Sequence, residues 1–270
     1  MYLKTALPLM VALYAAGVLA SQALVQGQPA QQPLQAPSQG APVRNPIPDT
    51  LTRISGGGLG AAKGKSASAA SAQLDDASRE KWERVPQLLA ALGLEPGHRV
   101  ADVGAGDGFY TERIAMRVGS SGRVRAVEIS ERSLAKLVER ITRAGLANVE
   151  PMLGAIVDPR LESGAYDAIL VYNSYHEFTQ HAAMLRHFLV ALKPGGRLVL
   201  VDPIHFKNRD LERHELVAIH EMSLAIVERE LTAGGFVVRS RDESFIRFTS
   251  VEDPGGFWLL VATRPVAVTR

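Results

Sequence analysis

The sequence contains no cysteine among its 270 residues. This absence excludes disulfide bonds, zinc sites with cysteine ligands and thiol catalysis, and it leaves the redox compartment open, because an exported protein need not contain cystine. Charge of one sign is not in excess either: 30 Lys and Arg stand against 28 Asp and Glu, and the basic residues are spread along the chain. We therefore expect no nucleic-acid partner.

Long apolar runs are scarce, and the one that is present lies at the N-terminus. Lys4 precedes an uncharged apolar run at 6–20, and the small residues at 21–23 follow it, as is typical of a secretory signal. Extended to Val25, the run has about 20 residues, a length that spans a bilayer, and Lys4 would keep the remainder outside. We expect 1–23 to be a signal peptide or membrane anchor, and the protein to be exported, periplasmic or membrane-anchored on the extracytoplasmic side.

The composition of residues 24–73 differs from that of the preceding run and is rich in Pro, Gln, Ala, Gly and Ser. Such a segment buries too little apolar surface to offset the entropy of ordering it, which predicts a disordered linker. The remaining residues, 74–270, hold enough apolar residues for one domain with its own core. The sequence gives no information about the oligomeric state of that domain.

The segment 99–111, RVADVGAGDGFYT, organises this domain. Its apolar residues predict a buried strand, and Gly104, Gly106 and Gly108 follow where the backbone turns into a helix. A dinucleotide fingerprint requires glycine or alanine at position 109, which is Phe here, so an NAD-dependent oxidoreductase is the less favoured alternative. A glycine turn between strand and helix also fits a structural turn without a ligand.

A second signal supports a ligand. Glu128 ends a predicted strand at 123–130 and follows Gly108 by 20 residues. In a doubly wound sheet an acidic residue at that place accepts hydrogen bonds from the ribose hydroxyls of a nucleotide-type cofactor. The two signals together predict a cofactor site at the carboxyl edge of a parallel sheet.

GxGxG after Asp102, the acid at position 128 and the later segment LKPGGRLVLVD resemble class I S-adenosylmethionine (SAM) dependent methyltransferases. The resemblance covers about 79–264 and implies a Rossmann-like, doubly wound α/β sheet of seven strands, mostly parallel with an antiparallel last strand. It implies SAM as cofactor, with the glycines near its methionine part and Asp102 at its ammonium group. Ile129, Ala155 and Asn173 complete the predicted cofactor-binding set, although Ala155 stands where the family often has an acid for the adenine amino group.

The segment NSYHEF, 173–178, follows the predicted fourth strand, where cofactor and acceptor should meet. It resembles the Asn-x-x-His-x-Phe segment of small-molecule methyltransferases and of a little-characterised group of predicted methyltransferases. Because an imidazole titrates near neutrality, His176 is a candidate general base, with Tyr175 as a weaker candidate for orienting the acceptor. A histidine that only packs at the mouth of the sheet is the alternative.

The resemblance implies methyl transfer to a small-molecule acceptor. The SAM sulfonium is a good leaving group, so such an enzyme supplies mainly alignment and desolvation. A different class of function also fits: an exported, non-catalytic binding module on the same fold, since SAM is made in the cytoplasm. No metal site is expected, because His205, His214 and His220 lack HExxH spacing.

Overall fold

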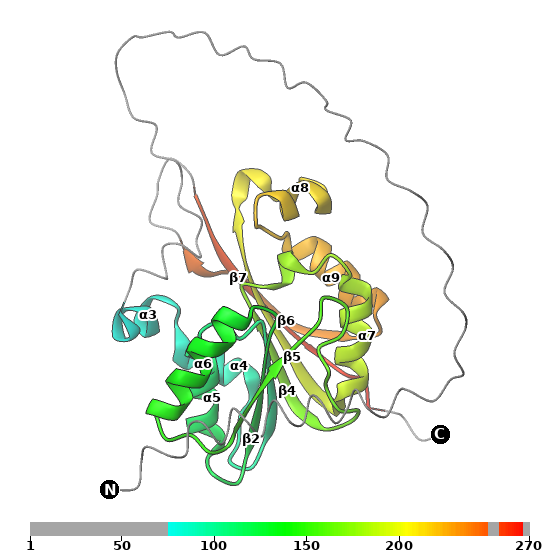
Figure 1. Ribbon diagram of the computed structural model, residues 1–270. Helices are drawn as coiled ribbons and strands as arrows, with labels where there is room; N and C mark the ends of the chain where they lie inside the picture. Colours follow the sequence, from blue (N-terminus) through cyan, green and yellow to red (C-terminus); the bar gives the residue numbers. More distant parts are fainter. Residues whose placement is uncertain (1–74, 248–253, 267–270) are drawn as a thin grey trace, which may run out of the picture. The chain divides into compact units, whose positions relative to one another are not determined.

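The computed structural model describes residues 75–247 and 254–266 (Figure 1). The predicted export segment 1–23 and the predicted linker 24–73 lie outside the described residues, so both stay predictions. Within the described ranges, no helix is both long and apolar enough to cross a bilayer.

The described strands form one seven-stranded sheet in the order β3-β2-β1-β4-β5-β7-β6. The strands from β3 to β5 run parallel, whereas β7 is antiparallel to both of its neighbours. This arrangement confirms the predicted fold class. The strands are β1 (Arg99–Val103), β2 (Arg123–Glu128), β3 (Val149–Leu153), β4 (Tyr166–Tyr172), β5 (Leu192–His205), β6 (Val237–Arg247) and β7 (Gly255–Thr263).

Helices cover both faces of the sheet (Figure 1). One face carries α4 (Val85–Leu92), α5 (Phe109–Val118) and α6 (Glu131–Arg143), and the other carries α7 (His181–Ala191), α8 (Arg213–Ala218) and α9 (Leu224–Ala233). Two single turns of 3₁₀ helix, η1 (Tyr175–Glu177) and η2 (Phe206–Asn208), follow β4 and β5.

The central strands read as continuous apolar runs because both of their faces are buried. Along β4 the side chains alternate: Ala168 and Leu170 belong to the core cluster under α4, α5 and α6, whereas Ile169 and Val171 belong to the cluster under α7, α8 and α9. This period of two leaves no solvated face on the strand. Functional side chains are therefore confined to the strand ends.

Residues 76–92 form two helices and not one continuous helix. Arg84 adopts a left-handed backbone with φ of +52° between α3 (Asp76–Trp82) and α4, and Pro86 stands in the first turn of α4. A proline in a first turn costs no hydrogen bond, so the chain restarts there. As a result, α3 is separated from α4 and reaches the glycine turn after β1.

In the C-terminal half, α8 and α9 are separate helices, and Ser223 is the N-cap of α9. The strand β5 spans fourteen residues: it begins at Leu192, which pairs with Tyr166 of β4, and β7 pairs with it as far as His205. This long strand extends to His205, directly before η2.

Candidate active site

Two neighbouring cavities lie at the carboxyl ends of β1, β2 and β4, the edge at which doubly wound sheets bind ligands. The first has a volume of about 210 Å³ and reaches from the glycine turn to α3. The second has a volume of about 310 Å³ and reaches past β2 toward η1. Gly104, Glu128 and Ser174 line both cavities, so one extended ligand can occupy the two together.

Two of the predicted glycines line these cavities for different reasons. A Cβ at Gly104 would lie 2.3 Å from the Ser174 Oγ, so glycine is needed there for the close approach of two loops. A Cβ at Gly106 would meet nothing within 4 Å, and its φ of +57° is one that other residues rarely adopt. Gly106 therefore leaves open space in the cavity that a side chain would fill.

Gly108 occupies a different position from the other two glycines. It lines neither cavity, and it is the N-cap of α5 with φ of +84°. A Cβ there would lie 2.9 Å from the Cγ of Leu137 on α6. The third glycine of the motif therefore permits the close packing of α5 against α6, and its predicted contact with the cofactor stays a prediction.

Asp102 lies at the floor of the first cavity and is almost fully buried. Its carboxylate accepts a hydrogen bond of 2.6 Å from the Thr111 hydroxyl. Burial raises the pKa of Asp102 to about 6, against the lowering effect of the Thr111 hydrogen bond. A buried carboxylate facing a cavity favours a cationic ligand group, which agrees with the predicted contact to an ammonium.

Glu128 lies between the two cavities, as its spacing predicted. Its Oε2 accepts from the Gly106 N–H at 2.8 Å, and its Oε1 accepts from the N–H groups of Ile129 and Ser130 at 2.8 Å each. Because the two carboxylate oxygens offer about four acceptor sites, Oε2 can still accept a ligand hydroxyl. The same carboxylate thus shapes the glycine turn and faces the ligand space.

The remaining predicted cofactor residues line one cavity each. Ile129 and Ala155 line the second cavity, with Ile129 largely exposed, and Asn173 lines the first. Asn173 adopts φ of +51°, a left-handed conformation that asparagine tolerates better than most residues. The side chain of Ala155 cannot accept a hydrogen bond, and the carboxylate of the nearby Asp158 accepts from the Arg160 backbone N–H.

Arg79 on α3 is a site residue that sequence reasoning missed. It lines the first cavity, its guanidinium lies 3.8 Å from the centroid of the Phe109 ring, and it pairs with Glu83 at 2.6 Å and Asp107 at 3.6 Å. Arg113 covers the Phe109 ring at 3.6 Å. These contacts join α3 to the glycine turn across 30 residues of sequence, so no local sequence pattern predicts them.

His176 lies in η1 with its ring buried. Its Nδ1 lies 3.1 Å from the Asp202 Oδ1, its Nε2 lies 3.3 Å from the Glu177 Oε1, and its backbone N–H donates to the other Asp202 oxygen. Burial lowers the pKa of His176, but the carboxylates of Asp202 and Glu177 outweigh it, so the pKa is raised above its ordinary value. His176 does not line either cavity, whereas its neighbour Glu177 lines the second.

The role predicted for Tyr175 does not agree with its position. Its side chain is fully buried in the core cluster beneath α7, α8 and α9, and its hydroxyl donates to the Glu230 Oε2 at 2.7 Å. Burial and the Glu230 carboxylate raise the pKa of Tyr175 far above its ordinary value. Tyr175 is therefore a packing residue that joins η1 to α9, and it does not orient an acceptor.

This correction predicts that Tyr175→Phe changes stability and not ligand binding. Loss of the hydrogen bond to Glu230, which keeps its Arg213 partner at 2.8 Å, should lower the free energy of unfolding by about 1–2 kcal/mol. Denaturant unfolding measures this loss, and a ligand titration of the same variant should match the wild type. An unchanged stability with reduced binding or turnover would return Tyr175 to the active site.

Comparisons with known proteins point to one family. Residues 100–196 match the family model described as a methyltransferase domain. A demethylmenaquinone methyltransferase of Bacillus cytotoxicus is 26% identical over 121 residues, which are 45% of this chain and 50% of the relative. A ubiquinone/menaquinone biosynthesis C-methyltransferase of Ectopseudomonas mendocina is 30% identical over 122 residues, which are 45% of this chain and 47% of the relative. The chain spans about half the length of these relatives.

A solved structure agrees at the level of the fold. A SAM-dependent methyltransferase from Aquifex aeolicus superposes with a TM-score of 0.59 at 24% sequence identity, over 74% of this chain and all of the other. The likeness extends over more of the chain than the sequence match does.

Proposed function

This chain carries a class I SAM-dependent methyltransferase domain, and from that premise we propose that it transfers a methyl group from SAM to a small-molecule acceptor. The observation that carries the proposal is the pair of cavities that share Gly104 and Glu128 at the carboxyl edge of the sheet. SAM, when bound, supplies a methyl group on a sulfonium, which is a good leaving group. The protein then needs to bind the cofactor and the acceptor, align them and exclude water from the site.

The residues of the first cavity fit the methionine part of SAM. Asp102 offers a buried carboxylate to an ammonium group, and Gly106 leaves space that a Cβ would occupy.

The second cavity fits the adenosine part. Glu128 faces it with acceptor capacity for ribose hydroxyls, and Ile129 and Ile156 provide an apolar surface against which a base can pack. Since Ala155 offers no carboxylate, recognition of the adenine amino group would depend on backbone groups. The acceptor then approaches from the end of β4, near Ser174 and Glu177.

We expect Glu128→Gln to weaken SAM binding by about 1.5–3 kcal/mol, or roughly 10–100-fold in Kd, because a charged acceptor is lost. Isothermal titration calorimetry at constant pH measures this loss. Glu131→Gln, an exposed neighbour in the first turn of α6, is the matched control and should bind as the wild type does. Equal affinity in a folded Glu128→Gln protein would remove this residue from the site.

Turnover is tested with labelled SAM and a panel of acceptors. Both curated relatives carry names of quinone-biosynthesis methyltransferases, so demethylated quinols are the first acceptors to try, followed by phenols and other small nucleophiles. Label transfer to any small acceptor supports the proposal. SAM binding without transfer to any of them would favour the binding-module alternative.

The extracytoplasmic location is part of the proposal and rests on the N-terminal sequence. Cell fractionation with a C-terminal tag tests it: the full chain should be found outside the cytoplasm, whereas a variant with Leu7 and Leu9 replaced by Lys should be retained inside. Equal distribution of the two proteins would contradict export. The site chemistry is the same in either compartment.

A further inference from the structure

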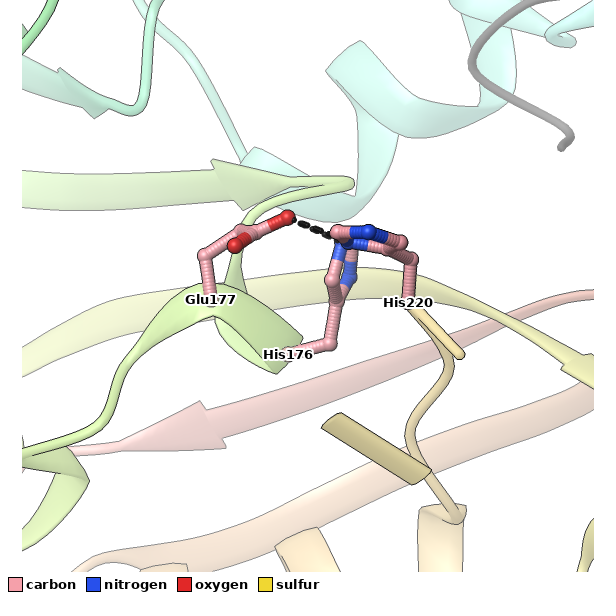
Figure 2. Close-up of side chains that lie close together, drawn as sticks. All are labelled: His176, Glu177 and His220. Carbon is pink, nitrogen blue, oxygen red and sulfur yellow. Dashed lines mark hydrogen bonds and ion pairs between the residues drawn. The ribbon is translucent and has the colours of Figure 1, made fainter. Parts of the chain in front are cut away.

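Three side chains converge beside η1: His176, Glu177 and His220 (Figure 2). Of these, Glu177 lines the second cavity, whereas His176 and His220 line neither. One ligand atom from each lies within 4.8 Å of the others. The His220 Nδ1 lies 2.7 Å from the Glu177 Oε1, and the His176 Nε2 lies 3.3 Å from the same oxygen. Figure 2 shows the carboxylate of Glu177 beside the two imidazole rings, with a dashed contact running from it toward them.

His176 is oriented from behind by a buried carboxylate. Asp202 is fully buried and contacts both the backbone N–H and the ring Nδ1 of His176. This contact leaves the Nε2 of a neutral ring with its lone pair directed at the cluster. A carboxylate on the far nitrogen is the arrangement that fixes metal-binding histidines and raises their basicity.

His220 is held by its chain neighbours. Glu221 is buried, and its carboxylate accepts from the His205 backbone N–H at 3.1 Å and from the Asn208 side chain at 3.0 Å, while it also contacts the His205 ring. His220 itself adopts φ of +58°, a strained conformation for a histidine. The side chain is exposed and is nevertheless aimed at Glu177 by this backbone.

The donor set selects among metal ions. Two imidazoles and one carboxylate suit Zn²⁺ and other divalent first-row metals, whereas Mg²⁺ and Ca²⁺ prefer oxygen ligands. Around a tetrahedral Zn²⁺ with bonds near 2.0–2.1 Å, neighbouring ligand atoms stand about 3.3 Å apart. The distance from His176 Nε2 to Glu177 Oε1 has this value, and the exposed Glu177 can move to open its shorter contact with His220.

We propose that His176, Glu177 and His220 bind one divalent first-row transition metal ion, of which Zn²⁺ is the reference case, with Asp202 as the positioning residue of His176. Three protein ligands leave a fourth position open, as in catalytic metal sites. Glu177 also lines the second cavity, so that position lies beside the ligand space. The same Nε2 cannot bind metal and accept a proton, so the site replaces the general-base role of His176.

Spacing along the chain could not predict this site, because His220 lies 43 residues after Glu177. The histidines that the sequence offers as metal candidates are His205, His214 and His220. In the structure the His205 ring contacts Glu221 instead, and His220 lies beside His176 and Glu177 of η1.

The test measures metal binding by the full chain and needs no methyl transfer, so it is independent of the proposed function. The metal-free protein is titrated with Zn²⁺ in competition with a chromophoric chelator, and with Co²⁺ read by its visible ligand-field absorption. We expect one Zn²⁺ per chain and an intense Co²⁺ spectrum typical of low coordination number. Mg²⁺ should not compete.

The sharpest variant is His220→Gly, since glycine suits the φ of +58° and the side chain is exposed, so the fold should persist. Asp202 does not contact the metal itself, so Asp202→Asn should lower Zn²⁺ affinity by roughly 10–100-fold. His220→Gly removes a ligand and should lower the affinity by more than that. His187→Ala is the control: this exposed histidine lies 3.8 Å from Asp158, and its loss should change nothing.

Two results would overturn the proposal. One is a folded wild-type chain that takes no Zn²⁺ from the competing chelator. The other is binding by His220→Gly, with thermal melting like that of the wild type, at wild-type affinity and stoichiometry. In the second case the metal is held by other histidines, and the cluster is an ion pair between one carboxylate and two imidazoles.

Discussion

Gly106→Val is expected to abolish SAM binding while the protein stays folded. The Cβ of a residue at this position projects into the open space of the first cavity, where nothing lies within 4 Å. A valine would place three carbons where the ligand is to lie, and it would strain a backbone with φ of +57°, which costs about 1–2 kcal/mol. Calorimetric titration with SAM measures the effect as a loss of all detectable heat of binding.

Strain and obstruction are separated by a matched control. Gly164 has φ of +62° and likewise nothing within 4 Å of an added Cβ, but it lines neither cavity. Gly164→Val should therefore carry a similar backbone cost and bind SAM as the wild type does. If Gly106→Val also binds normally, the glycine turn is only a turn between strand and helix, and the ligand lies elsewhere.

Asp102→Asn is expected to stabilise the ligand-free protein at neutral pH and to weaken its binding of SAM. Burial raises the pKa of Asp102 to about 6, whereas an unfolded aspartate titrates near 3.9. Above pH 6 the folded state therefore holds a charge that burial disfavours, at a cost on the order of 3 kcal/mol at most. The asparagine removes this charge and can still accept from the Thr111 hydroxyl.

The sign of the pH dependence follows from the raised pKa. The folded state binds a proton more readily than the unfolded state, so the cost of Asp102 fades as pH falls from about 6 toward 4. Denaturant unfolding should show that Asp102→Asn gains stability at pH 7 and gains little at pH 4. SAM affinity of the wild type should fall as pH drops through about 6, because the protonated carboxyl no longer attracts an ammonium group.

The asparagine variant also separates a functional from a structural carboxylate. If Asp102 only supports the glycine turn, the substitution leaves SAM affinity unchanged, and its pH dependence remains like that of the wild type. A loss of stability at pH 7 would show that the charge is compensated in the folded protein, and it would contradict the raised pKa.

The sequence predicted the parts of the site that lie close together along the chain. The strand, the glycine turn and Asp102 fall within one short segment, and Glu128 follows at a distance fixed by one helix and two turns. Their geometry depends on local backbone and on the register of β1 against β2, which a buried parallel sheet imposes. This is why Gly104, Gly106 and Glu128 lie together at the cavities.

The parts that the sequence did not predict depend on side-chain direction or on distant contacts. Tyr175 and His176 are adjacent in a 3₁₀ turn, and the turn sends one ring into the core and the other toward Asp202, which spacing alone does not distinguish. Arg79 reaches the site only because the chain breaks at Arg84. His220 arrives through a loop after α8 whose path depends on the buried Glu221.

Calorimetric titration of the full chain with SAM, with NAD⁺ titrated in a parallel experiment, tests the central claim most directly. We expect one SAM to bind per chain, S-adenosylhomocysteine to compete with it, and NAD⁺ to give no heat of binding. A folded protein that binds NAD⁺ in preference to SAM, or that binds neither, would contradict a SAM site formed by Asp102, Gly106 and Glu128.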